Sequence, residues 1–200
     1  MRPAARPSLP TRPRDWLRRQ ANVLVADPAI DVKTRWRDRR QTMNRNGVVE
    51  ALRKMAGWRA RCMFCGDSEG CDIEHYRPKS VASFRTNVFD WTNLLWLCQP
   101  CNRRKGNRFP LSLGQAALLL DPASDRTWDY FDFVPFTGYL VARVDLTADR
   151  RSRADATLQE ELTRLNDQIV LEERRRAGRH LRRATERYLT LPPRNVSLAV

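Results

Sequence analysis

The residues best suited to chemistry form one block in the middle of the chain, and two Cys-x-x-Cys pairs enclose it. Four thiolates suit one tetrahedral zinc ion, because a two-residue gap lets both sulfurs of a pair bend round the metal. A long insert separates the two pairs, so the insert must fold between them. We therefore expect a structural zinc held by Cys62, Cys65, Cys98 and Cys101, with paired buried free thiols as the alternative. Cys71 has no such partner and is expected to be a free, partly buried thiol.

The insert contains an acidic residue beside a histidine. Residues 72–76 have the alternating pattern of a short strand. Adjacent side chains of a strand point to opposite faces, so Glu74 and His75 can share a metal site only where the strand twists or ends. Hydrolysis of a phosphodiester needs a base to activate water and a hard cation to hold the phosphate, and a neutral imidazole can be that base. By itself the pair is more typical of a solvated strand, but its place between the cysteine pairs favours a site.

The segment before this block is predicted to be helical after an extended arm. Residues 1–14 are rich in Pro and Arg, which favours an arm. Apolar residues then recur at helical spacing over residues 16–24, and a thinner helical pattern covers residues 32–40. The strongest apolar stripe covers residues 48–56, so this helix would lead directly into the first cysteine pair.

The segment after the block changes character twice. Residues 128–144 have the composition of a β hairpin that turns at Thr137-Gly138. From Ala154 the period becomes helical again, with an apolar stripe that continues to Tyr188. A break near Gly178 would divide this stretch into two helices.

The composition indicates a globular protein with an affinity for polyanions. The chain has 200 residues, of which 42% are apolar, and a net charge of +14. Residues 1–61 contain 16 Lys/Arg against 5 Asp/Glu, so much of the basic surplus precedes the block. Such a field attracts nucleic acid, although a basic surface in an arginine-rich organism is the alternative. No apolar run could cross a membrane and no secretory signal begins the chain, so we expect a cytoplasmic location.

The order of these residues resembles the HNH endonuclease family, whose active site is a ββα-metal fold. The likeness rests on the two cysteine pairs, on Glu-His-Tyr-Arg-Pro-Lys at 74–79, on residues 90–95 and on Asn-Arg-Arg-Lys-Gly-Asn at 102–107. It covers residues 62–110, with a looser likeness further along the chain. Within the family, the chain is similar to the bacterial HNH proteins of anti-phage systems, the Septu and retron-associated type, which work beside a separate ATPase.

The resemblance implies a role for each matching residue. His75 matches the first His of the family motif and would be the general base that takes a proton from water. Glu74 and Asn102 would hold one catalytic Mg²⁺ or Mn²⁺, with water and phosphate oxygens completing the shell. Asn93 matches the middle Asn, which in the family fixes the loop behind the catalytic His. The implied catalytic set is therefore His75, Asn93 and Asn102.

Two of these positions depart from the commoner family pattern. Many members have Asp before the His, and Glu74 is one methylene longer, which changes its reach to a metal. Asn102 stands where others have His and offers a hard, neutral oxygen, which favours Mg²⁺ over softer ions.

Basic residues next to these positions could contact phosphates and position a strand without reading its bases. The alternative for each is an ordinary solvated surface. We expect DNA as the substrate, with RNA also open. The five candidates are Arg77, Lys79, Arg103, Arg104 and Lys105.

Two other functions remain open from the residues alone. One is a zinc-stabilised DNA-binding module without catalysis, which the basic flanks would also suit. The other is an adaptor subunit whose C-terminal apolar stripe, residues 158–188, contacts a partner protein such as the ATPase. A monomer with no exposed apolar patch would count against the adaptor.

We expect an α+β fold, built on a ββα-metal HNH core with a four-cysteine structural zinc. Helices would flank this core on both sides, and a β hairpin would follow it. The expected division is a basic N-terminal arm with helices at 1–57, the HNH core at 58–110, a loop and hairpin at 111–150, and a C-terminal helical segment at 151–200.

Overall fold

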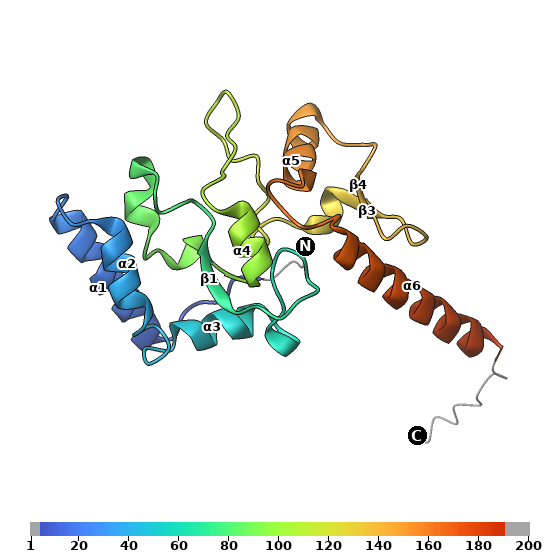
Figure 1. Ribbon diagram of the computed structural model, residues 1–200, viewed down its shortest axis with the longest axis horizontal. Coiled ribbons are helices and arrows are strands. Elements are labelled where there is room, and N and C mark those ends of the chain that lie inside the picture. Colours follow the sequence, from blue (N-terminus) through green and yellow to red (C-terminus); the bar gives the residue numbers. More distant parts are fainter. Residues whose placement is uncertain (1–4, 191–200) are drawn as a thin grey trace, which may run out of the picture.

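The computed structural model describes residues 5–190, and Figure 1 shows the arrangement of its elements. The ends of the first and last predicted segments, residues 1–4 and 191–200, lie outside the described residues. Within the described part, helices and two small antiparallel sheets confirm the predicted α+β class.

Three helices precede the cysteine block, as the apolar spacing predicts. They are α1 (Thr11–Ala26), α2 (Val32–Arg40) and α3 (Val48–Met55). The extended arm is wrong for its last four residues, because α1 already begins at Thr11. Pro10 precedes the helix and Pro13 lies in its first turn, where the missing N–H of a proline costs no intrahelical hydrogen bond.

The central unit consists of two strands followed by a helix. Strands β1 (Asp72–His75) and β2 (Leu94–Leu97) pair antiparallel, with His75 opposite Leu94. Two 3-10 turns, Ala82–Asn87 and Trp91–Asn93, lie in the connection between them. Helix α4 (Gln99–Lys105) follows β2 at once. This order is that of the expected ββα core.

The β1–β2 hairpin is packed on both of its faces. Aromatic rings of the N-terminal helices cover one face, where Trp36 of α2 and Trp16 of α1 both pack against Phe89. Helix α4 covers the side of β1 that carries Glu74, through the contact of that residue with Lys105. All four residues of β2 are buried, so the hairpin lies in the hydrophobic core of the protein.

The C-terminal part contains the predicted hairpin and two helices. Strands β3 (Phe131–Phe133) and β4 (Leu140–Ala142) form the hairpin, and α5 (Ala148–Leu158) and α6 (Gln168–Leu189) follow. Figure 1 shows α6 leading away from the rest of the protein, and Leu181 and Tyr188 are exposed on it.

The predicted break near Gly178 is wrong, because α6 continues through that residue. The helices are instead separated between Leu158 and Gln168. Asn166 accepts a hydrogen bond from the backbone N–H of Leu140 (3.0 Å) and donates one to its carbonyl (2.9 Å), which fixes the segment to β4. The side chain of Asp167 then caps α6. A single glycine inside a helix costs only about 1 kcal/mol relative to alanine, so Gly178 need not end a helix whose first residue is fixed by tertiary contacts.

Among the described residues, none of the helices combines the length and apolar character that a membrane crossing requires.

Candidate active site and metal centre

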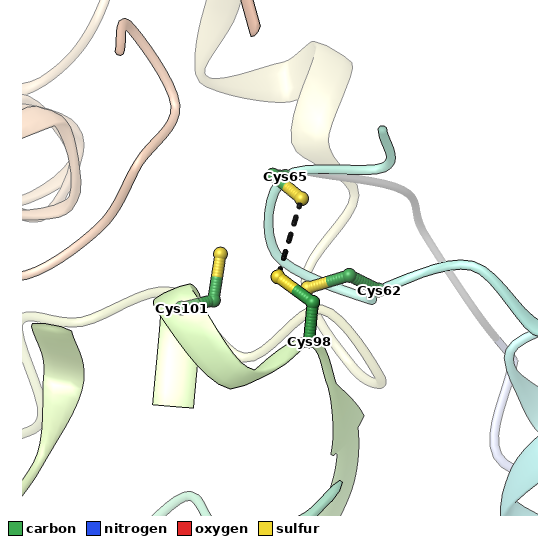
Figure 2. A group of neighbouring side chains, drawn as sticks. All are labelled: Cys62, Cys65, Cys98 and Cys101. Carbon is green, nitrogen blue, oxygen red and sulfur yellow. Dashed lines mark hydrogen bonds between the residues drawn. The ribbon is translucent and has the colours of Figure 1, made fainter. Parts of the chain in front are cut away.

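The four predicted zinc ligands come together in the structure. Their sulfur atoms all lie within 4.8 Å of one another, and all four residues are buried (Figure 2). The Cys65 and Cys98 sulfurs are 3.9 Å apart. Zn–S bonds of the usual length give a tetrahedron with sulfur atoms about 3.8 Å apart, so the cluster has the size and donor type of a structural zinc site.

Local backbone structure brings each pair of cysteines round the cluster. In the first pair, the N–H of Gly66 donates to the carbonyl of Cys62, and Gly66 has φ 69°, a conformation that glycine adopts without strain. In the second pair, Cys98 precedes α4 and Cys101 lies in its first turn. The N–H of Met63 donates to the carbonyl of Trp96, which ties the first pair to β2. The cluster therefore joins the segment before β1 to the junction of β2 and α4.

Cys71 lies outside this cluster. Its thiol is free and the residue is exposed, rather than partly buried as the sequence predicts. Its backbone N–H donates to the carbonyl of Leu97 in β2 (2.9 Å), directly before β1 begins at Asp72.

His75 is enclosed at the end of β1. It is 1% exposed, and its ring lies 4.2 Å from that of Trp36, centroid to centroid. Its Nε2 is 3.0 Å from the carbonyl oxygen of Val88. Because a carbonyl oxygen only accepts, Nε2 carries the proton and Nδ1 carries the lone pair. Nδ1 is buried and has no hydrogen-bond partner among residues 5–190.

The charge state of His75 follows from its surroundings. Burial lowers the pKa of the imidazole to about 3, and the nearby positive charge of Lys79 acts in the same direction. The ring is therefore neutral near pH 7. A neutral imidazole with a fixed tautomer has a lone pair that can accept a proton, but a pKa this low makes it a weak base until an anionic phosphate beside it raises the pKa.

Glu74 points to the opposite face of β1 and meets a buried lysine. Its Oε1 lies 3.1 Å from Nζ of Lys105 on α4, and Lys105 is 0% exposed. Burial raises the pKa of the Glu74 carboxyl, while the lysine opposes that rise. Loss of one partner from a buried pair costs about 3–5 kcal/mol, so each of these side chains depends on the other. A metal ion bound to Glu74 would therefore place a second positive charge beside the same carboxylate as Lys105.

Asn102 lies one helical turn before Lys105 on the same face of α4. Its side-chain nitrogen donates to Asp72 (3.2 Å), which is on the same face of β1 as Glu74. This hydrogen bond leaves the amide oxygen of Asn102 free to bind a ligand. Oxygen donors from an amide and carboxylates are those that Mg²⁺ and Mn²⁺ take, so the residues of this face fit such an ion.

The carboxylates alone do not form a complete catalytic metal site. Among residues 5–190, the four cysteines are the only close group of three or more Cys, His, Asp or Glu ligand atoms. A catalytic ion at Glu74 and Asn102 would therefore take much of its shell from water and phosphate.

Asn93 fixes the loop that follows His75. It is 0% exposed, accepts a hydrogen bond from the N–H of Arg77 (2.7 Å) and donates to the carbonyl of Arg77 (3.1 Å). Its amide also donates to the carbonyl of Asn87, the residue before Val88. One side chain thus joins the exit of β1 to the segment whose carbonyl holds the His75 ring.

We expect Asn93→Ala to destabilise the protein by about 2–4 kcal/mol, because buried backbone groups of Arg77 would lose their partners. Urea unfolding of the full chain measures this loss. Asn107→Ala, an exposed position in the same domain, is the control and should stay within about 0.5 kcal/mol of the wild type. Equal stability of the two variants would show that Asn93 does not fix the loop.

The order of these residues matches that of a known family. Residues 62–108 match the family model of HNH endonucleases. The match includes both cysteine pairs, β1, β2 and α4, and it supports nuclease activity in general and an interaction with nucleic acid. No curated protein matches the chain. The helices before residue 62 and the segments after residue 108 lie outside the HNH domain.

Within the HNH domain, the five basic candidates occupy different environments. Arg103 is exposed on α4, while Arg77 and Lys79 are half-buried beyond the end of β1. Arg104 forms an ion pair with Asp167 (3.3 Å). Lys105 is the exception, because its ammonium is buried against Glu74.

Two residues near the HNH site were not anticipated from sequence. Asp72 contacts Asn102 and also forms an ion pair with Arg40 of α2. The two-residue period of a strand could have placed Asp72 beside Glu74, because residues 72 and 74 share a face. Trp36 over His75 could not have been found in this way, since nothing in the spacing connects α2 to the histidine.

Proposed function

We propose that the protein is a metal-dependent endonuclease that hydrolyses phosphodiester bonds of DNA. The observation that carries this proposal is the unpartnered Nδ1 of a neutral His75 in a domain that matches HNH endonucleases. A buried nitrogen lone pair without a protein partner is a position for the hydrogen of a water molecule. The proposed nucleophile is that water.

In this mechanism His75 acts as the general base. Nδ1 takes a proton as the water oxygen forms its bond to phosphorus, and the bond from phosphorus to the leaving 3′ oxygen breaks with its electron pair. The leaving oxygen then takes a proton from solvent. General-base catalysis of this kind contributes typically 10²–10⁴-fold to a rate.

Glu74 and Asn102 are the proposed ligands of Mg²⁺ or Mn²⁺. When bound, the ion supplies positive charge to the phosphate and the leaving oxygen. The side chains of His75 and Glu74 lie on opposite faces of β1. His75 is the last residue of β1, and the end of a strand is where adjacent side chains can reach one site. Lys105 would keep Glu74 ionised and oriented before the metal arrives.

Contacts to the DNA backbone are proposed for Arg77, Lys79, Arg103 and Arg104, with Lys105 contributing its charge from inside the site. These contacts would position the scissile phosphate at the end of β1 without reading the sequence. The proposal gives Asn93 the structural role of holding the loop between β1 and the Val88 carbonyl.

The closed position of His75 gives a physical reason for regulation. With Trp36 over the ring, a phosphate cannot approach His75 until α2 shifts. We propose that the protein acts in bacterial anti-phage defence beside a separate ATPase, and that assembly or substrate binding opens the site. Cleavage by the protein alone should then be weaker than cleavage in the presence of the product of a neighbouring ATPase gene.

We expect Asn102→Ala to raise the Mg²⁺ concentration for half-maximal plasmid cleavage by about tenfold or more, because one oxygen ligand is lost. Asn107→Ala is the matched control, since it removes an exposed asparagine from the same domain. A magnesium titration of plasmid nicking by the two variants measures the difference. Identical titration curves would refute Asn102 as a ligand.

A second function is favoured by one specific contact. The Glu74–Lys105 pair neutralises the carboxylate without any metal, as a zinc-stabilised DNA-binding module without catalysis would need. That function predicts DNA binding with no cleavage under any divalent ion. It also predicts that His75→Ala leaves every DNA-dependent property unchanged.

A further inference from the structure

An exposed tryptophan lies just before the HNH domain in the chain. Trp58 is 80% exposed and lies in a 3-10 turn, Trp58–Ala60, between α3 and the first zinc cysteine. Most large aromatic side chains are buried because their transfer from water is favourable. Trp58 is not among the buried residues of the hydrophobic core, so packing does not account for its position.

The turn that carries Trp58 has an unusual and well-supported backbone. Arg59 (φ 67°) and Ala60 (φ 43°) are consecutive non-glycine residues in the left-handed region. Such a conformation persists only where surrounding structure holds it, and it is common at functional sites. Here the carbonyl of Ala60 accepts a hydrogen bond from Gly70 (2.9 Å), and Arg61 forms a β-bridge with Glu69. Residues 69–70, which follow the first cysteine pair, therefore hold the backbone of the turn next to Trp58.

An open hollow beside the ring is lined by four basic side chains and by two glutamates, Glu50 and Glu69. The guanidinium carbon of Arg59 lies 5.1 Å from the Trp58 ring centroid. The other basic side chains of the hollow are Arg53, Lys54 and Arg61. Lys54 is paired with a glutamate at 2.7 Å and Arg53 with another at 4.0 Å. Within the part of the chain that the structure describes, neither Arg59 nor Arg61 has a carboxylate within salt-bridge distance, so both can take an external anion.

An aromatic face beside free guanidinium groups is suited to unpaired nucleotides. Every base has a π-face that can stack on an indole, and the adjacent phosphates can pair with arginines. Bases inside a duplex are already stacked on one another and cannot offer that face. Trp128 is also exposed, but apolar residues such as Phe133, Leu140 and Leu181 line the groove beside it, together with Arg61 and Arg174.

We propose that Trp58, Arg59 and Arg61 form a binding site for single-stranded nucleic acid. An unpaired base stacks on the open face of Trp58, and the two arginines bind the neighbouring phosphates. The inference rests on the proposed function for the identity of the polymer. It adds that the substrate contains an unpaired segment, which is held next to the first zinc cysteine while the ββα unit acts.

The test is a binding assay with the full chain carrying His75→Ala and no added divalent ion, so that cleavage plays no part. The probes are fluorescent oligothymidylate and the same strand in a duplex with oligoadenylate. Trp58→Ala should weaken binding of the single strand by about 5- to 100-fold. It should leave duplex affinity within about twofold, because stacking on a paired base is not available.

Matched variants separate stacking from other contacts. Trp58→Phe should retain most of the single-strand affinity, whereas Trp58→Leu should lose as much as Trp58→Ala. Phe136→Ala changes an exposed aromatic residue that is in the lining of neither hollow, so it is the control and should bind like the parent. The double change Arg59→Ala and Arg61→Ala should flatten the salt dependence of binding, while Trp58→Ala should not.

Three results would overturn the proposal. The first is unchanged single-strand affinity in Trp58→Ala, and the second is an equal loss of duplex affinity in the same variant. The third is full single-strand affinity in Trp58→Leu, which would indicate a surface for apolar protein contacts instead. Stacking at Trp58 in a protein that never cleaves would sink the proposed function alone. Cleavage that is indifferent to Trp58, with unchanged binding, would sink this inference alone.

Discussion

Replacement of His75 by alanine is expected to lower the single-turnover cleavage rate by about 10²–10⁴-fold, because the proposed attack on phosphorus loses its base. The affinity for DNA should stay within about threefold, since the buried ring contributes no charge to the surface. Rapid-quench measurement of cleavage at saturating Mg²⁺, beside binding measured without a divalent ion, separates the two effects.

A second variant distinguishes loss of the base from loss of side-chain packing at this position. His75→Asn can still donate a hydrogen bond to the Val88 carbonyl, but an amide cannot accept the proton of the attacking water. It should therefore be as slow as His75→Ala while unfolding closer to the wild-type temperature. Cleavage by both variants within about threefold of the wild type would rule out His75 as the base.

Removal of zinc is expected to unfold the HNH domain rather than merely to stop turnover. Binding of a structural zinc is worth about 10–16 kcal/mol in small domains, which equals or exceeds the whole stability of a typical protein. Here the four cysteines join the start of the domain to β2 and α4, so loss of the ion would remove the bonds that hold these elements together. Far-UV circular dichroism and thermal melting, with and without a strong chelator, measure the effect.

The cysteines supply their own control. Cys98→Ser should lose bound zinc and cooperative unfolding, whereas Cys71→Ser should keep both, because Cys71 is exposed and lies outside the cluster. Zinc content from elemental analysis should be one ion per chain for Cys71→Ser. A metal-free protein that retained its melting temperature would show that the cluster holds no structural ion.

The parts of the site that sequence could predict are those with short, rigid spacing rules. The zinc ligands follow from the geometry of a tetrahedral ion and the strand at residues 72–76 from a period of two, whereas the ββα order is what the resemblance to HNH endonucleases implies. The order Glu74-His75 also predicts two faces, and the structure places the two side chains against different helices.

The parts that sequence could not predict depend on contacts between distant segments. Trp36 reaches His75 only because α1 and α2 fold back over the hairpin. Lysine is usually exposed, and only the position of Lys105 one turn after Asn102 on α4 brings it against Glu74. The place where the C-terminal helices separate depends in the same way on the hydrogen bonds of Asn166 to β4.

The central claim is that the HNH domain of this chain hydrolyses DNA with a divalent ion. Conversion of supercoiled plasmid to nicked circles by the purified zinc-loaded protein tests it most directly, measured with Mg²⁺, with Mn²⁺ and with no divalent ion. We expect nicked product with either ion and none in their absence. Plasmid that is bound but never nicked under any of these conditions, with or without the ATPase, would contradict the claim and leave a DNA-binding module held together by zinc.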